Sequence, residues 1–164
     1  MIFMLKKLFV LTAAALAISG SALGLAAPVA QQRAAIEAAK AEVPATCVMY
    51  GYREDEEKSV INFRDNDAFL EYEVDVVTAT AKVVEVEIKG SNFAGSTQVA
   101  KSVEDIRAIV LEAYPDAQNL VIELEKEGNA QYYEAEFSTP KFIKAELKLN
   151  PVTGAIAERE HDYR

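Results

Sequence analysis

Apolar and polar residues alternate along residues 141–160, which divide into two arms around a turn. Pro151 and Gly154 lie between the arms and suit a turn, because Pro sets φ and Gly accepts positive φ at little cost. The period of two in the first arm is typical of a β-strand with one face on a core and the other in water. The apolar residues of that arm, with charged residues between them, are Ile143, Ala145, Leu147 and Leu149. Residues 141–160 therefore predict a strand, a turn and a second strand.

The same pattern occurs 73 residues earlier, in residues 68–87, and the two stretches align without a gap. One position differs in chemistry: Ala81 stands where the later stretch has Gly154. Matched positions include Phe69 with Phe142, Val74 with Leu147, Thr80 with Thr153 and Glu87 with Glu160. We interpret the two stretches as one unit present twice, in tandem.

Each of these hairpins is preceded by a helix candidate and two further strand candidates. The helix predicted at 103–114 follows Ser102, a favourable N-cap, and has acidic residues in its first turn. The other predicted elements are a helix at 29–43 and strands at 48–53, 59–64, 120–126 and 131–137. Each unit thus reads α-β-β-β-β. We predict an α+β fold in which each helix packs on a short antiparallel sheet, and leave open whether the two units share one sheet.

The N-terminus has the features of an export signal. Lys6 and Lys7 precede an apolar run at 8–18, and small residues lead to a cleavage site after Ala26. A retained membrane anchor is the alternative, but the apolar run is shorter than the ~20 residues that a spanning helix needs. We therefore expect a secreted or periplasmic protein without a membrane span after signal cleavage. The predicted divisions are a signal at 1–26, a first unit at 27–89, a linker at 90–101 and a second unit at 102–164.

Composition excludes several classes of function. The chain has a net charge of −9, which disfavours binding to nucleic acid and to anionic membrane surfaces. One Cys and one His rule out the familiar His/Cys zinc sites. We read Cys47 as a small buried apolar residue, and His161, close to the C-terminus, as part of a solvated tail. No motif of a nucleophile, a phosphate loop or a metallopeptidase is present, so we expect no enzyme and no cofactor.

Clustered carboxylates invite a metal hypothesis. Residues 54–57 and 65–67 offer oxygen ligands for a cation such as calcium, but solvated hairpin tips explain them as well, and we predict no metal site. Glu71, Glu73 and Asp75 alternate with core residues on one strand. They predict an acidic outer face on the first unit that could receive a basic partner.

Aromatic residues are the better candidates for a protein interface. Tyr132 and Tyr133 fall on opposite faces of one strand, so one of them should point away from the helix. Phe69 and Phe142 occupy the polar phase of their strands, which would place them outside the main core or in a groove between the units. The candidate interaction residues are Tyr50, Tyr52, Phe69, Tyr132 and Phe142.

The closing segment at 147–156 resembles that of the PepSY domain, which has the form apolar-x-apolar-Asp/Asn-x-x-Thr-Gly-x-Ile. Asn150, Thr153 and Gly154 match this form, and the preceding helix and Tyr-rich strand also fit. The first unit resembles the family as a degenerate copy, since it keeps Thr80 but has Ala81 in place of Gly. The resemblance extends over nearly all of the chain after the signal.

The resemblance implies a function without catalytic residues. PepSY domains occur in propeptides of secreted metallopeptidases and as exported proteins thought to restrain proteolysis, with a cystatin-like helix on a curved sheet. We therefore expect a secreted binding protein that restrains a peptidase by occlusion. The alternative is an envelope sensor or scaffold that binds a small ligand or another envelope protein. The two differ in whether a co-secreted protease is slowed, and the oligomeric state is left open.

Overall fold

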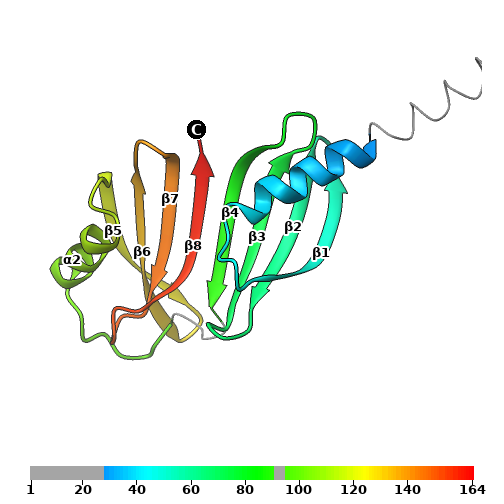
Figure 1. The fold of residues 1–164 in the computed structure, drawn as a ribbon. Coiled ribbons are helices and arrows are strands. Elements are labelled where there is room, and N and C mark those ends of the chain that lie inside the picture. Colours follow the sequence, from blue (N-terminus) through cyan, green and yellow to red (C-terminus); the bar gives the residue numbers. More distant parts are fainter. Residues whose placement is uncertain (1–27, 91–94) are drawn as a thin grey trace, which may run out of the picture.

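The structure, a computed structural model, describes residues 28–90 and 95–164. The predicted signal at 1–26 lies outside the described residues. Eight antiparallel strands form one sheet in the order β1-β2-β3-β4-β8-β7-β6-β5 (Figure 1). Two helices accompany it: one over residues 28–40, and α2 (Val103–Ala113). The strands are β1 (Val48–Asp55), β2 (Lys58–Asp65), β3 (Leu70–Val77), β4 (Lys82–Gly90), β5 (Gln118–Glu127), β6 (Ala130–Ser138), β7 (Phe142–Leu149) and β8 (Ile156–Tyr163).

The two halves of the chain are joined edge to edge. Strand β4, from the first half, pairs with β8, from the second, in a register that runs from Glu85 opposite Asp162 to Lys89 opposite Glu158. The question left open by the sequence is thus answered: both groups of four strands belong to one sheet. Glu42 adds a second link, because its carboxylate accepts hydrogen bonds from Tyr163 Oη at 2.6 Å and Lys141 Nζ at 3.1 Å.

Both helices pack on the same face of the sheet. Residues directly opposite one another on neighbouring strands share a face. One such row crosses β2, β3, β4, β8, β7 and β6, and it consists of Ile61, Val74, Val86, His161, Ala145 and Phe137. Ala35 and Ala39 of the first helix pack over the first half of this row, and Ile106 and Val110 of α2 pack over the second half. Tyr163 contacts both clusters, so the core continues across the β4–β8 seam.

Helix α2 begins as the sequence predicts. Ser102 Oγ accepts the N–H of Asp105 at 3.2 Å, and Asp105 Oδ2 accepts the N–H of Ser102 at 2.9 Å, which forms a capping box. The first helix ends at residue 40, three residues before the predicted end, and two tight turns at Ala41 and Glu42 follow. Among residues 28–90 and 95–164, neither helix has the length and apolarity to cross a bilayer.

One strand phase was predicted wrongly. Ile143 was expected on the core face, and Phe142 outside the main core or in a groove between the units. Phe142 is instead 9% exposed and packs in the second core cluster, and Ile143 is 58% exposed. The pairing of β7 with β8 shifts between Phe142 and Lys144. Because a shift of one residue exchanges the two faces of a strand, this irregularity turns the Phe142 ring inward.

The turns that precede β4 and β8 have the same geometry. Ala81 N–H donates to the carbonyl of Val77, and Gly154 N–H donates to that of Asn150, each at 2.8 Å. Ala81 takes φ +52° and Gly154 takes φ +77°. The first hairpin therefore keeps a left-handed residue at this position even though Ala replaces Gly.

Candidate functional site

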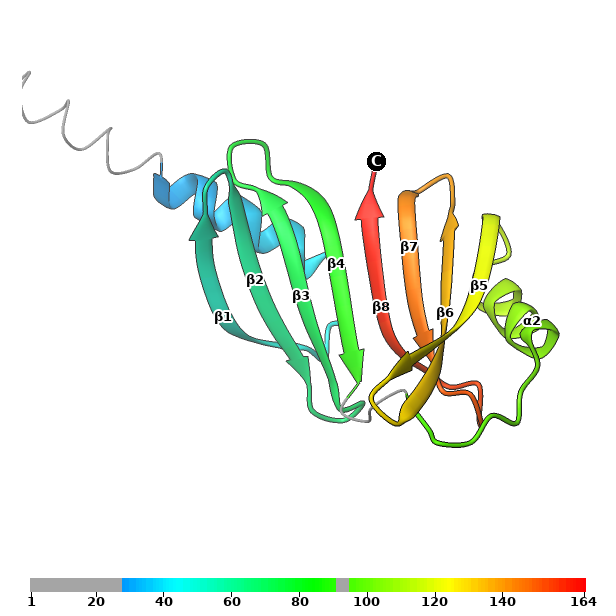
Figure 2. The same cartoon turned by 180° about the vertical axis from the view of Figure 1, so that it is seen from behind.

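The face of the sheet opposite the helices is lined with charged side chains, and we call it the open face. Figure 2 shows the molecule from behind, with the first helix beyond β1–β3. Cross-strand register places the side chains of the open face on five central strands. They are Glu71, Glu73 and Asp75 on β3; Glu85, Glu87 and Lys89 on β4; Glu158, Glu160 and Asp162 on β8; Lys144, Glu146 and Lys148 on β7; and Glu134 and Glu136 on β6.

One row of the open face consists of glutamates alone. Directly opposite pairs join Glu73, Glu87, Glu160, Glu146 and Glu136 across β3, β4, β8, β7 and β6. Like charges at such positions destabilise a sheet. The rows on either side contain lysines, so the negative charge is densest along the middle of the sheet and spans both halves of the chain.

The lysines of the open face neutralise only part of this charge. Lys144 Nζ lies 2.9 Å from Glu146 and 3.0 Å from Glu136, and hydrogen bonds to these carboxylates raise its pKa. Lys148 pairs with Glu158 at 2.9 Å. Within the described ranges, no lysine or arginine nitrogen lies within 4.0 Å of the carboxylate oxygens of Glu134, Glu160 or Asp162.

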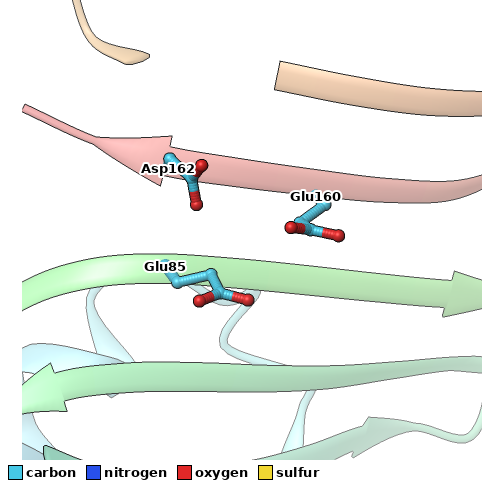
Figure 3. Close-up of side chains that lie close together, drawn as sticks. All are labelled: Glu85, Glu160 and Asp162. Atoms are coloured by element: carbon cyan, nitrogen blue, oxygen red, sulfur yellow. The ribbon is translucent and has the colours of Figure 1, made fainter. Parts of the chain in front are cut away.

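Three carboxylates converge at the seam between β4 and β8. Oxygens of Glu85, Glu160 and Asp162 lie within 4.8 Å of one another (Figure 3). Partial burial raises the pKa of Glu85, and the negative charges of Asp75 and Glu160 raise it further. Burial likewise raises the pKa of Glu160, followed by the charges of Glu146 and Asp162. Grouped carboxylates alone do not distinguish an ion site from an interaction surface, so we assign no ion here.

A second group lies on the neighbouring strands. Oxygens of Glu134, Glu136 and Glu146 also lie within 4.8 Å of one another. The pKa of Glu134 is raised by burial and by the charges of Glu146 and Glu136. Both groups therefore hold negative charge at a cost to the fold, and the same property favours any cation that approaches the open face.

The structure separates the aromatic residues that the sequence proposed as one interaction set. Tyr50 on edge strand β1 is 55% exposed and lies under the Arg64 guanidinium, 4.9 Å from the ring centroid. Tyr132 is half-buried on the open face, with Lys148 Nζ 5.7 Å from its ring centroid. Tyr52 is half-buried and donates its hydroxyl to Glu54 at 2.7 Å. Since Tyr52 packs against the first core cluster, and Phe142 lies in the second, these two are directed to the helix side.

Phe69 remains an exposed candidate. It is 69% exposed and has φ +55°, a conformation that is costly for a residue with a side chain. The preceding turn is rigid, because Asp65 Oδ1 accepts the N–H groups of Asp67 and Ala68 at 2.9 Å. Thr46 Oγ1 donates to Asp65 Oδ2 at 2.8 Å. Of the oxygens considered as calcium ligands at 65–67, both of Asp65 are thus already engaged by the protein itself.

Beside Phe69 lies a hollow of about 550 Å³ that is also lined by Arg64, Leu70 and Lys89. Arg64 lines this hollow with Phe69 and also stacks on Tyr50, so Tyr50 and Phe69 lie at one corner of the first half. The corner is far along the sheet order from Tyr132 on β6, since β1 is an edge strand and β6 is next to the opposite edge.

His161 was expected in a solvated tail, and this expectation is wrong. It is 7% exposed, its Nε2 lies 2.9 Å from Tyr114 Oη, and its ring stacks on Phe142 at 4.4 Å with 6° between planes. Burial lowers its pKa to about 4, and the charges of Arg159 and Lys141 contribute. The reason is that β8 continues to Tyr163 between two neighbouring strands, so His161 is part of the core.

Sequence reasoning found the acidic residues of β3 and the solvent-facing charged residues of β7, but not the joining of these strands into one open face. The alternation of Glu158, Glu160 and Asp162 was the available signal for β8. Its meaning depended on the β4–β8 pairing, which places these residues beside Glu85 and Glu87.

Comparison with known proteins shows a family match for part of the chain. Residues 100–160, which include α2 and most of the four strands that follow it, match the model of the PepSY family, described as the peptidase propeptide and YPEB domain. The resemblance stated from the sequence is thus confirmed for this part of the chain. Among solved structures, a BLIP-like protein from Bacteroides fragilis is similar, with a TM-score of 0.32 and 14% identity over 80% of this chain and 86% of that one. No curated protein matches the sequence.

Proposed function

We propose, from the premise that residues 100–160 match the PepSY family, that this chain is an exported binding protein that restrains a peptidase without chemistry of its own. The observation that carries the proposal is the open face, which spans all of the central strands and is not occupied by either described helix. A broad, uncovered sheet face can lie against a partner and block access to its cleft.

The chemistry of the described side chains supports a binding role. His161, the sole histidine, is buried and engaged by Tyr114, which removes the usual general base. Burial raises the pKa of Cys47, the sole cysteine, so its thiolate, the reactive form, is disfavoured. The groups most often used as base and nucleophile are therefore unsuited to catalysis here.

The proposal includes export and an internal duplication. Residues 1–26 would act as the signal, and units at 27–89 and 102–164 would flank a linker at 90–101. Each half has one helix followed by four antiparallel strands, and the turns at Ala81 and Gly154 make the same hydrogen bond, which supports a duplication. The predicted export supports a peptidase outside the cytoplasm as the partner.

The test starts from the exported form, residues 27–164, immobilised and exposed to the secreted and envelope proteins of its source organism. Each captured peptidase is then purified and assayed with and without the free protein. A matched column carries an unrelated acidic protein of similar size. We expect a peptidase that is retained only on the first column and loses activity in proportion to the protein added.

Two results would contradict the proposal. One is capture of no peptidase under conditions in which other partners are retained, which would favour the envelope sensor or scaffold. The other is a captured peptidase that stays fully active at saturation, which would leave binding but remove restraint.

A further inference from the structure

The middle of the open face is a line of carboxylates with regular spacing. Five glutamates, one on each of five neighbouring strands, stand directly opposite one another from Glu73 to Glu136. Neighbouring strands are about 4.8 Å apart, so the line is about 19 Å long. It crosses the β4–β8 seam and therefore exists only when both halves are folded together.

The protein's own cations balance this line only in part. Lys89 Nζ lies 2.6 Å from Glu87, Arg53 lies 3.7 Å from Glu73, and Lys144 is shared between Glu146 and Glu136. Glu160, at the centre, has no lysine or arginine within 4.0 Å in the part of the chain that the structure describes. The pKa of Glu160 is raised by burial and by Glu146, Asp162 and Glu87, which is the signature of carboxylates that repel one another. The repulsion would be relieved by cations from outside.

We infer that the open face binds a lysine- and arginine-rich surface of a protein partner, with the partner's cations placed over the glutamate row. The inference rests on the proposed function, since it specifies the partner of the same face. Arginine suits this role best, because its guanidinium can bridge the carboxylates of two neighbouring strands with paired hydrogen bonds.

The geometry favours a helix of the partner laid across the strands. A helix rises about 5.4 Å per turn, close to the spacing of about 4.8 Å between strands, so one cation per turn meets about one glutamate per strand. Lys89 and Lys144 belong to the flanking rows, but their ammonium groups lie against Glu87, Glu146 and Glu136 of the middle row, so the partner's cations compete with them there. Anionic partners, such as phosphate backbones and acidic lipids, are repelled by the same row.

The probe is a synthetic 18-residue helical peptide with lysine and arginine along one side, and its reference is a peptide of equal composition with these residues scattered around the helix. Affinity for residues 27–164 is measured by titration calorimetry at several salt concentrations. We expect the one-sided peptide to bind more tightly than the scattered one, and its affinity to fall as salt rises.

Variants of this protein test whether the peptide binds at the glutamate row. In one protein Glu73, Glu87, Glu146 and Glu160 are changed to Gln. Its control changes four exposed glutamates away from the row, which are Glu37, Glu56, Glu112 and Glu127, so that the net charge is the same. Each screened ion pair contributes about 1.5- to 5-fold in affinity. We therefore expect the row variant, which loses four such pairs, to bind at least about fivefold more weakly and the control to bind within about twofold of the parent protein.

Two smaller changes keep the test decisive if the fourfold variant does not fold. Glu146→Gln with Glu160→Gln should weaken binding several-fold. Lys89→Gln with Lys144→Gln should strengthen it, because both lysines pair with glutamates of the row. Equal loss in the row variant and its control would reduce the effect to net charge and overturn the inference. Unchanged affinity in both row variants would overturn it too.

The outcome can be separated from that of the proposed function. If a peptidase is captured and restrained but binds the row variant as tightly as the parent, the restraining role stands and the cationic partner is wrong. If the one-sided peptide binds through the row while no peptidase is restrained, the cationic surface stands and the peptidase is wrong.

Discussion

The two halves of the molecule have the same order of elements, but a phenylalanine at aligned positions is buried in the second half and exposed in the first. Phe142 begins β7 and packs against His161 and Tyr163 with centroid distances of 4.4 and 5.1 Å. Phe69, which aligns with it 73 residues earlier, lies in the turn before β3 with its ring in solvent. The position that aligns with His161 is Ile88, which offers no flat ring to stack on. One sequence pattern can thus serve a core in one half and a surface in the other.

Truncation of the two phenylalanines should give the largest difference in stability between the two halves. Phe142→Ala removes a buried ring and should lower the free energy of unfolding by about 3 kcal/mol or more. Phe69→Ala, its matched control, should change that free energy by less than about 0.5 kcal/mol, because the ring is exposed. Urea unfolding followed by circular dichroism measures both. Equal losses would mean that Phe69 is buried in solution and that the halves do not differ here.

His161 should make the second half sensitive to acid. Its pKa is about 4 in the folded protein, against 6.5 in an unfolded chain. Between these values the unfolded chain binds the proton first, so stability is fully present above pH 6.5 and is lost as the pH falls. From pH 7 to pH 5 the loss from this residue should be about 2 kcal/mol.

The acid test needs a partner variant, because other groups act in the opposite direction. The raised pKa values of Glu85, Glu134 and Glu160 add stability as the pH falls, since these carboxylates take up protons more readily when folded. His161→Gln keeps a polar group for the Tyr114 hydroxyl and removes the titration of His161. It also loses the ring that stacks on Phe142, so the comparison uses the change of stability with pH and not its absolute value. We expect the parent to lose more stability than this variant between pH 7 and pH 5. Parallel stability curves would show that His161 is not held neutral.

Local signals in the sequence were sufficient for the elements but not for their assembly. Ser102, with acidic residues after it, located α2 within one residue of its end, and period-two alternation located the strands within a few residues. The β4–β8 pairing joins residues far apart in the chain, which no local pattern encodes. The open face and the burial of His161 both depend on that pairing. Phe142 was placed wrongly for a different reason, because alternation assumes a regular strand and β7 is irregular at that point.

A side chain at Gly154, in the turn before β8, should destabilise the protein more than a side chain at Gly128. Gly154 has φ +77°, and a Cβ there would meet Ile109 Cδ1. Gly154→Ala should cost about 1–2 kcal/mol for the left-handed conformation, plus the displacement of Ile109. Gly128 has φ +60°, and no atom of the described residues lies within 4 Å of the place that a Cβ would take, so Gly128→Ala measures the conformational cost alone. Thermal unfolding of both proteins should place Gly154→Ala lower, and equal values would exclude the Ile109 contact.

The corresponding turn of the first half should respond in the opposite direction, by a smaller amount. Ala81 already stands at φ +52°, so Ala81→Gly relieves about 1–2 kcal/mol of backbone strain and gives back about 0.5–1 kcal/mol as entropy of the unfolded chain. The net gain in unfolding free energy should be about 0.5 kcal/mol. Ala79→Gly is the control, because this exposed residue of the same turn is not among those with positive φ and can only lose stability. If Ala81→Gly lowers the free energy of unfolding as much as Ala79→Gly does, Ala81 does not have the left-handed conformation that Gly154 has in the second turn.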